Sequence, residues 1–357
     1  MHLDEPSWWY VPVPDGRARL LAPLGRLYGW IGERRFRRRQ AYRSRFPVIC
    51  VGNFTAGGTG KTPLAILIAE LLKARGQSPV FLTRGYGGSA PGPAWVDEEA
   101  PAAAHRFGDE PLLLTRVAPT LVSRDRKAGV LMLEASGRKV DAVIMDDGLQ
   151  NPALAKDFAI AVVDGARGLG NGEVIPAGPL RASMEFQLGL VDAIVVREPQ
   201  GKADGEPEGV HALLKRRFPG PVLEARTEAQ GDTSWLAERP VVAFAGIVNP
   251  QRFYALLESL GASLIERVTF PDHHVVSLKE AERLLRLAAE GSAQLVTTEK
   301  DWVRLKGGAC VPEALVQATR PLPITLAFEA RHLERLTSLI EAATQQQGFR
   351  RVRPPQL

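Results

Sequence analysis

The chain contains a glycine-rich segment of the kind that binds phosphate, Gly52-Asn-Phe-Thr-Ala-Gly-Gly-Thr-Gly-Lys-Thr62. An apolar run at 47–51 precedes it and a helical pattern at 63–73 follows, which is the order that a phosphate-binding loop requires. Glycine has no Cβ, so backbone N–H groups can approach phosphate oxygens, and the helix adds the positive end of its dipole. The expected nucleotide contacts come from Thr55, Ala56, Gly57, Gly58, Thr59, Gly60, Lys61 and Thr62.

Three positions of this loop decide how it is interpreted. Lys61 would reach the β- and γ-phosphates, and the Thr62 hydroxyl would bind Mg²⁺. Thr55 stands where the general pattern has a glycine. The alternative is a glycine-rich turn with an incidental lysine, but it does not explain why Lys-Thr opens a helix. The loop therefore predicts that the chain binds a nucleoside triphosphate.

Two neighbouring carboxylates, Asp146 and Asp147, end an apolar strand predicted at 140–145. An acid at such a strand end faces the phosphate loop in nucleotide-binding proteins and helps to hold Mg²⁺. A polar strand end without a metal is the alternative. Adjacent strand residues point to opposite faces, so the sequence leaves open which of the two acids would contact the metal.

A second set of residues could be either catalytic or structural when only the neighbouring sequence is considered. Asp109 and Glu110 precede a helix-like apolar run and could act only as first-turn partners of the helix dipole. His273 and His274 follow Asp272, and a carboxylate neighbour can hold the tautomer of a histidine. Loop histidines are, however, more often ordinary surface residues. We favour His273 because it follows Asp272 directly.

Other polar groups follow predicted strands, where parallel sheets bind ligands. They lie in Arg84-Gly-Tyr-Gly-Gly88, in Arg124-Asp-Arg126 and in a long loop from Asn171 to Arg181. Arg84, Asn171 and Arg181 are therefore weaker candidates for contacts with a phosphate or a sugar.

The elements that must position these residues alternate between strand and helix. This alternation predicts an α/β fold with a mostly parallel sheet and helices on both faces, followed by a smaller α/β domain. The predicted division is 1–45, a kinase-like domain at 46–225, a smaller domain at 226–345 and a tail at 346–357. The predicted strands are 47–51, 79–83, 119–123, 140–145, 158–163, 190–196, 221–225, 240–246, 262–269, 294–298 and 323–328. The predicted helices are 63–75, 126–136, 250–260, 277–290 and 331–344.

The N-terminal segment differs from the rest in charge. Residues 1–45 carry ten arginines and four acids, a net charge of +6, whereas the whole chain is +5. Its apolar residues fall at helical spacing, and tryptophans and arginines surround them. This pattern is typical of an amphipathic helix in a membrane surface that is rich in anionic lipid. The alternative is a helix docked on the protein's own core. No nucleic-acid-binding module accompanies the basic run, so no nucleic-acid partner is expected.

The composition and length of the chain limit the class of protein and the number of domains. The 357 residues are 45% hydrophobic and 24% charged, as in ordinary globular proteins, and they suffice for two domains. No apolar run is long enough to predict a membrane-spanning helix, and the acids near the start do not fit a signal peptide. Cys50 and Cys310 form no metal or redox motif, and no oligomer is implied.

Taken in order, the motifs resemble those of the tetraacyldisaccharide 4'-kinases, the lipid A 4'-kinases of Gram-negative bacteria. The resemblance covers about residues 45 to 305 and includes Thr55 in the loop. Three positions depart from the family pattern, because Leu149, Asn151 and Ala182 replace the usual Phe, His and Glu. The motifs that carry the resemblance are the phosphate loop, Arg84-Gly-Tyr-Gly-Gly88, Gly108-Asp-Glu-Pro111, Asp146-Asp-Gly-Leu-Gln150, the Asn171 to Arg181 loop, Phe270-Pro-Asp-His-His274 and Thr298-Glu-Lys-Asp301.

The resemblance implies transfer of the γ-phosphate of ATP to the 4'-hydroxyl of a tetraacyl glucosamine disaccharide 1-phosphate, which gives lipid IVA. It implies that Asp109 accepts the hydroxyl proton, that His273 orients Asp109 and that Lys61 offsets phosphoryl charge. It also implies that Glu110 joins Thr62, Asp146 and Asp147 as a Mg²⁺ ligand. The expected location is peripheral, on the cytoplasmic face of the inner membrane. A membrane-associated ATPase switch and a kinase of another small molecule are the alternatives.

Overall fold

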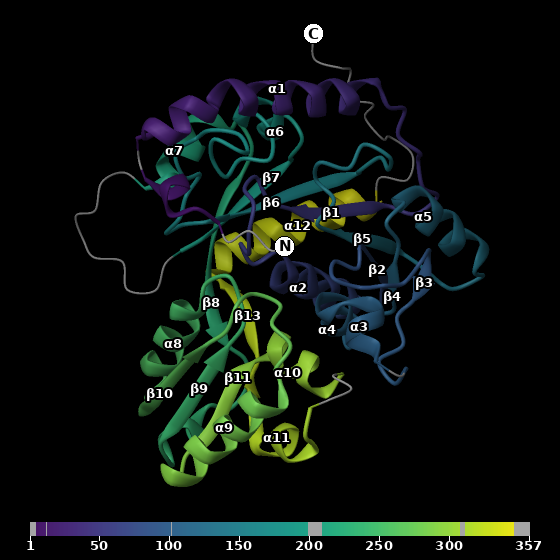
Figure 1. Cartoon of the computed structure of the whole chain (residues 1–357). Helices are drawn as coiled ribbons and strands as arrows, with labels where there is room; N and C mark the ends of the chain where they lie inside the picture. Colours follow the sequence, from purple (N-terminus) through teal and green to yellow (C-terminus); the bar gives the residue numbers. More distant parts are fainter. Residues whose placement is uncertain (1–4, 12, 101, 199–208, 308–310, 346–357) are drawn as a thin grey trace. The chain divides into compact units, whose positions relative to one another are not determined.

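The structure is a computed structural model that describes residues 5–11, 13–100, 102–198, 209–307 and 311–345 (Figure 1). The chain forms two compact units, each assembled from separate segments. Unit 1 contains Met1–Arg84, Ser123–Arg226 and Ala327–Leu357, and unit 2 contains Gly85–Val122 and Thr227–Leu326.

This division differs from the predicted one in three respects. Residues 85–122 belong to unit 2 and residues 327–345 return to unit 1, whereas the N-terminal 45 residues join unit 1. A segment of unit 1 ends at Arg226, one residue beyond the end of the predicted kinase-like domain at 225. The differences have a physical origin, because contiguous patterns do not reveal that a chain leaves a unit and later returns to it.

Unit 1 is built on parallel strands in the order β8-β7-β6-β1-β5-β2. All residues of β1, β2, β5 and β6 are buried, as expected for strands covered on both faces. The predicted strands are confirmed to within three residues at their starts. Their bounds are β1 Val48–Gly52, β2 Pro79–Thr83, β5 Ala142–Asp146, β6 Phe158–Asp164, β7 Ala193–Arg197 and β8 Val222–Ala229.

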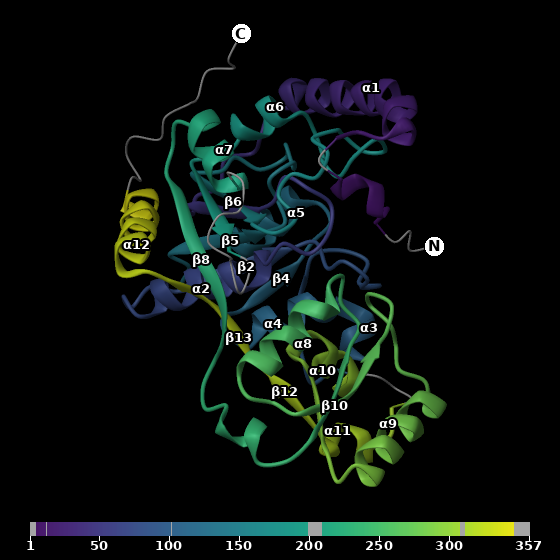
Figure 2. The same cartoon turned by 90° about the vertical axis from the view of Figure 1, so that its left-hand side faces the viewer.

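The helices of unit 1 include two that matter for function. Helix α2, Lys61–Lys73, starts directly after the phosphate loop and packs its apolar side on β1 and β5. Helix α1, Gly16–Arg38, lies beside α6, where the rings of Phe36 and Phe186 are 5.3 Å apart (Figures 1 and 2). The other helical segments are η1 Ser7–Tyr10, α5 Arg126–Ala135, α6 Met184–Leu188, α7 Val210–Arg217 and α12 Ala330–Gln345.

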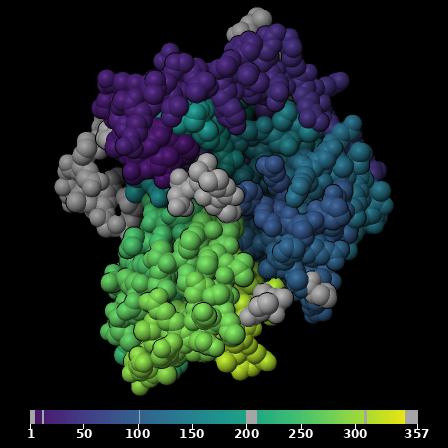
Figure 3. Space-filling view, viewed as in Figure 1, coloured from purple at the N-terminus to yellow at the C-terminus, as the bar shows by residue number. Residues whose placement is uncertain are grey.

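Helix α1 packs on unit 1 through its small residues. Its buried positions are Ala18, Ala22, Gly25 and Gly29, which are spaced by four, three and four residues. Gly25 permits the close approach, because a Cβ there would be 2.5 Å from the carbonyl oxygen of Val174. The large apolar side chains of α1 face outward, and Figure 3 shows this purple region at the surface. The exposed residues are Leu20, Leu24, Leu27, Tyr28, Trp30 and Ile31.

Unit 2 is built on a parallel sheet in the order β10-β9-β11-β12. Alternate residues of β9 serve two cores, because Val241, Ala243 and Ala245 face α8 whereas Val242 and Phe244 face α9. The strands are β9 Val241–Ala245, β10 Leu264–Thr269, β11 Gln294–Thr298 and β12 Thr319–Leu322, and β3 Ala94–Trp95 pairs with β4 Thr120–Val122. The helical segments are α3 Ala103–Phe107, α4 Asp109–Thr115, η2 Ser234–Ala237, α8 Pro250–Ser259, α9 Leu278–Glu290, α10 Glu299–Lys306 and α11 Glu313–Ala318.

The inserted segment 85–122 joins unit 2 through α10. Val303 of α10 shares a buried cluster with Phe107 and Leu112. Helix α10 was not among the predicted helices, because its eight residues are short and rich in charge. Strand β13, Ile324–Phe328, was predicted and carries the chain back to unit 1.

Candidate active site

The phosphate loop of unit 1 has the geometry that its sequence predicts. Gly60 is the N-cap of α2 and has φ 99°, a left-handed conformation that glycine adopts without strain. The Asn53 side-chain amide donates to the carbonyl of Gly57 at 3.2 Å, and the Ala56 N–H donates to the carbonyl of Pro179 at 2.8 Å. The loop is therefore held by hydrogen bonds to other parts of unit 1.

Asp147 is the carboxylate that lies closest to this loop's lysine. Its Oδ1 atom is 3.9 Å from Lys61 Nζ and 3.1 Å from an Arg181 guanidinium nitrogen. Arg181 also donates from Nε to the carbonyl of Thr55 at 3.1 Å. Burial alone would raise the pKa of Asp147, but the charges of Lys61, Arg181 and Arg126 outweigh burial and lower it. Asp147 is thus ionised beside the residue that would read the phosphates.

The predicted metal ligands provide hard oxygen donors, which are the ligands that Mg²⁺ prefers. Thr62, Asp146 and Asp147 belong to unit 1, whereas Glu110 belongs to unit 2 and pairs with Lys300 at 3.2 Å. Among the described residues, no group of three or more His, Cys, Asp or Glu forms a metal cage. Mg²⁺ usually keeps several waters and binds one or two carboxylates together with substrate phosphates, so the donors of unit 1 fit it.

Arg126 belongs to the Arg124-Asp-Arg126 segment that follows a predicted strand, although no individual role was predicted for it. Its guanidinium is buried and donates to the carbonyl of Ser123 at 2.5 Å and to those of Asp146 and Asp147 at 3.5 Å. Arg126 therefore fixes the backbone that carries both acids. Its position directly after Asp125, the N-cap of α5, was the available signal.

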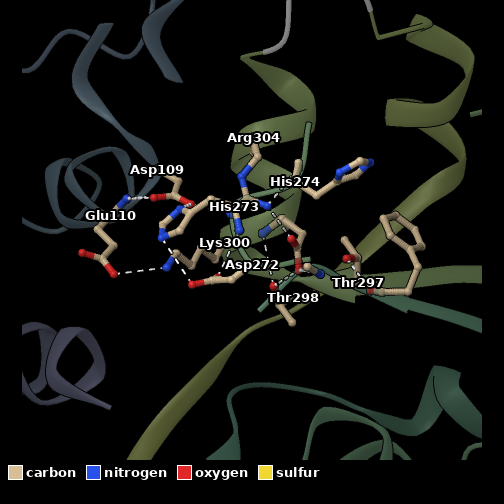
Figure 4. Close-up of polar contacts among 12 residues, drawn as sticks. Asp109, Glu110, Asp272, His273, His274, Thr297, Thr298, Lys300 and Arg304 are labelled. Atoms are coloured by element: carbon tan, nitrogen blue, oxygen red, sulfur yellow. Dashed lines mark hydrogen bonds and ion pairs between the residues drawn. The ribbon is translucent and has the colours of Figure 1, made fainter. Parts of the chain in front are cut away.

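The acidic and histidine candidates of unit 2 meet in one cluster (Figure 4). Asp109 opens α4 after Gly108, whose φ of 90° directs the chain into the helix. Asp109 Oδ2 is 3.1 Å from His273 Nδ1 and also forms an ion pair with Arg304. Asp109 Oδ1 accepts from the Glu110 N–H at 2.9 Å. Both oxygens of this buried carboxylate are thus occupied.

The two neighbouring histidines have different surroundings. His273, with φ 59°, contacts Asp109 and lies 5.4 Å from the ring of Tyr86. His274 instead stacks on Phe270 with ring centroids 4.9 Å apart and contacts the Glu280 carboxylate at 3.0 Å. His273 thus contacts Asp109 whereas His274 contacts Glu280, and the choice of His273 stays a prediction.

Two cations of α10 complete the cluster. Lys300 pairs with Glu110, and Arg304 pairs with Asp109 and with Asp301 at 2.8 Å. Burial would raise the pKa of Asp109, but the charges of Lys300 and Arg304 and the hydrogen bond from His273 outweigh it and lower the pKa well below its usual range. The acid therefore stays ionised. No role was predicted for either cation, although Lys300 lies in the Thr298-Glu-Lys-Asp301 motif and a spacing of four residues places both on one helix face.

The weaker substrate candidates have unequal surroundings. Arg84 is exposed. Asn171 is buried, donating to the carbonyl of Ala177 at 2.9 Å and accepting from the Glu173 N–H at 3.1 Å. Its side chain thus organises its own loop. Arg181 binds the phosphate loop and Asp147, as described above.

Comparison with known proteins identifies the group to which the chain is related. The sequence profile of the tetraacyldisaccharide-1-P 4'-kinase family, LpxK, matches residues 17–341. The chain belongs to this family. Tetraacyldisaccharide 4'-kinases of Methylorubrum extorquens (strain PA1) and Methylobacterium nodulans are 47% and 48% identical to it, each over 90% of the chain and over 94% and 90% of their own lengths.

A solved LpxK structure has a similar fold. The crystal structure of LpxK from Aquifex aeolicus in complex with ATP aligns with a TM-score of 0.71 and 25% identity, covering 92% of this chain and 99% of that one. The predicted α/β fold class is thereby confirmed for this LpxK family member.

The three departures from the LpxK pattern are accommodated inside unit 1. Leu149 is buried against Gly52, and Asn151 accepts from the Ala153 N–H at 2.9 Å. The carbonyl of Ala182 accepts from Gln187 at 2.9 Å. These three residues thus have structural contacts here.

Proposed function

We infer that this LpxK family member transfers the γ-phosphate of ATP to the 4'-hydroxyl of a tetraacyl glucosamine disaccharide 1-phosphate, forming lipid IVA. The observation that carries this inference is the complete phosphate loop, with Lys61 opening α2 beside the ionised Asp147. Family membership defines the acceptor. The loop defines the donor as a nucleoside triphosphate.

The residues of unit 1 would bind and orient ATP. Backbone N–H groups of 57–60 would donate to phosphate oxygens, whereas the Ala56 N–H is already used by the carbonyl of Pro179. Lys61 would offset the negative charge that develops on the transferring group. Thr62 with Asp146 or Asp147 would hold Mg²⁺, and Glu110 stays a proposed ligand. The Mg²⁺ that these residues would hold would neutralise part of the charge on the phosphates.

The residues of unit 2 would handle the proton of the sugar hydroxyl. Phosphoryl transfer depends more on placement than on basicity, so a carboxylate of low pKa can still serve. The side chain of His273 is 18% exposed and that of Asp109 only 4%, which makes His273 the more accessible member of the pair. We therefore propose that the proton leaves through the Asp109–His273 pair, with His273 nearer to solvent and Asp109 fixing its orientation. This assignment reverses the one that the resemblance implies, in which His273 orients Asp109.

The test is transfer of labelled γ-phosphate to the tetraacyl disaccharide 1-phosphate. Wild type should form lipid IVA, whereas Lys61→Ala and Asp109→Ala should not. No transfer by the wild type would refute the proposal. An ATPase switch would instead show ATP-dependent membrane binding that survives Asp109→Ala, and a kinase of another small molecule would keep its activity after deletion of residues 1–40.

We also propose that α1 places the enzyme on the membrane surface. Its small residues pack on unit 1, and Leu20, Leu24, Leu27 and Trp30 face outward. The arginines of its C-terminal turns lie at the end of the same helix. Among the described helices, none is long and apolar enough to cross a bilayer. A helix with an exposed apolar stripe and a basic end suits an anionic lipid surface, at about 1 kcal/mol per basic residue. The cytoplasmic face, which supplies ATP, is the proposed side.

Binding to liposomes that contain anionic lipid tests this placement. Replacing five arginines of α1 and its C-cap by Gln should release the protein, whereas unchanged binding would refute the proposal. A control with five exposed arginines elsewhere replaced by Gln should bind like wild type. The test set is Arg34, Arg35, Arg37, Arg38 and Arg39, and the control set is Arg226, Arg283, Arg286, Arg331 and Arg335.

A further inference from the structure

A carboxylate from the N-terminal segment lies against the phosphate loop. A Cβ added to Gly57 would collide with the Oε1 atom of Glu5, so this carboxylate fills the space beside the Gly57 Cα. Gly57 has φ 88°, and glycines of such loops leave room for anions to approach the backbone. The chain thus places an anion of its own against a loop that is built to accept phosphate.

Glu5 is held there by two side chains. Its Oε2 atom accepts from Arg167 at 2.8 Å and from the Tyr10 hydroxyl at 2.7 Å, and the Arg167 guanidinium lies 4.8 Å from the centre of the Tyr10 ring. Its other oxygen, Oε1, is buried and has no hydrogen-bond partner within the described part of the chain. Only one of the two carboxylate oxygens of Glu5 is therefore hydrogen-bonded, and burying the other without a partner costs free energy.

The position of Arg167 is fixed by its own loop. Its backbone N–H donates to Asp164 Oδ1 at 3.1 Å, directly after β6. The N-terminal segment docks on the same loop, since the Trp9 carbonyl accepts from the Asn171 N–H at 2.7 Å and the Trp9 indole donates to the carbonyl of Pro176 at 3.1 Å. Arg167 is thus anchored beside the phosphate loop, whereas its acidic partner comes from a separate segment of the chain that precedes α1.

A second arginine near the loop provides a contrast. Arg197 lies next to Gly60, with a guanidinium nitrogen 3.3 Å from the position of a Cβ on that glycine. It pairs at 2.8 Å with Asp164, a buried residue at the end of the neighbouring strand. Asp164, the partner of Arg197, belongs to the sheet and stays in place. Glu5, the partner of Arg167, lies outside the sheet, so an incoming anion could take its place.

We propose that Arg167 binds the terminal phosphate of ATP and that Glu5 holds its place until ATP arrives. This proposal rests on the ATP binding inferred above. A phosphate and a carboxylate repel each other, so an entering γ-phosphate displaces Glu5 from Gly57. Arginine pairs with phosphate through two parallel hydrogen bonds, so Arg167 exchanges one anion for the other. ATP binding therefore releases Glu5, and the affinity for ATP includes the cost of this release.

The test compares the dissociation constants of a non-hydrolysable ATP analogue and of ADP, measured by calorimetry on the full chain. Glu5→Gln removes the competing charge and keeps the shape, so it should bind the analogue about tenfold more tightly and leave ADP binding nearly unchanged. Arg167→Gln should weaken the analogue about tenfold in the Glu5→Gln background and by less in the wild type, where it also removes the pair with Glu5 that ATP must break.

The experiment includes a matched control variant and has defined results that would contradict the proposal. Glu70→Gln removes the same charge from α2, nine residues beyond Lys61, and should not change the affinity for either nucleotide. Glu5→Ala should behave like Glu5→Gln. Unchanged or weaker analogue binding by both Glu5 variants, or an Arg167→Gln effect of equal size on ADP, would overturn this proposal alone. A wild type that does not bind the ATP analogue would overturn the proposed function as well.

Discussion

The two units build their functional residues in opposite ways. In unit 1 the phosphate loop uses consecutive residues, 55–62, and mainly backbone groups. In unit 2 the cluster around Asp109 uses side chains that are 164 and 195 residues away in sequence, His273 and Arg304. A local motif thus forms one set of residues and long-range packing of charged groups forms the other. We therefore expect the loss of a single side-chain charge to destabilise unit 2 more than unit 1.

The largest effect should come from Lys61→Ala. The loop keeps its shape through backbone contacts, but the lysine charge is lost, so the rate of phosphoryl transfer should fall by roughly 10³-fold. Unfolding by urea should be close to that of wild type, which separates chemistry from folding. A marked loss of stability would contradict the view that this loop depends mainly on backbone groups.

Arg304→Met should act mainly on stability. It leaves the Asp109 carboxylate buried without its guanidinium partner, which should lower the free energy of unfolding by about 3 kcal/mol at pH 7. Arg283→Met, at an exposed position of α9, is the control and should change little.

The same variant has a defined pH dependence. The pKa of Asp109 is lowered in the folded chain, so its contribution to stability is complete above its ordinary value of 3.8 and is lost as the pH falls below it. The stability difference between wild type and Arg304→Met should therefore shrink in urea titrations below about pH 4. A difference that is constant from pH 7 to 3 would show that the pair with Asp109 is not its source.

The third prediction separates the two histidines. His273→Gln should lower the transfer rate about 100-fold, as expected for loss of an acid–base group, without changing ATP affinity. His274→Gln should keep a rate near that of wild type, because its ring contacts Phe270 and Glu280. Equal losses in steady-state rates would mean that both histidines only support the fold.

The smallest effect concerns the capping box that starts α9. Ser277 and Glu280 cap each other, and Ser277→Ala should cost about 1 kcal/mol of stability without changing the transfer rate. The backbone N–H of Ser277, followed by bonds from His274 and the Ser277 hydroxyl, lowers the pKa of Glu280 to about 2. This contribution is present above the ordinary pKa of 4.5 and is lost as the pH falls towards 2. Chemical denaturation at pH 7 and pH 3 measures the cost of Ser277→Ala and the pH-dependent contribution of Glu280.

The contrast also explains what the sequence could predict. The phosphate loop and the strands of unit 1 depend on neighbouring residues, so their positions followed from local patterns. Lys300 and Arg304 lie on a short charged helix, and nothing local connects them to Asp109. The amphipathic nature of α1 was visible, but its packing face was not, because that face consists of small residues such as Gly25. The division into units failed where the chain returns to an earlier unit.

The discontinuous composition of unit 2 has a consequence for synthesis on the ribosome. His273 follows Asp109 by 164 residues, so at roughly 5–20 residues per second it is added about 8–30 s later. By the end of that interval most of unit 1 has been synthesised, whereas α10, the helix against which α4 packs, has not. Asp109 must stay hydrated until α10 leaves the ribosome, and the insertion at 85–122 cannot complete its packing before then.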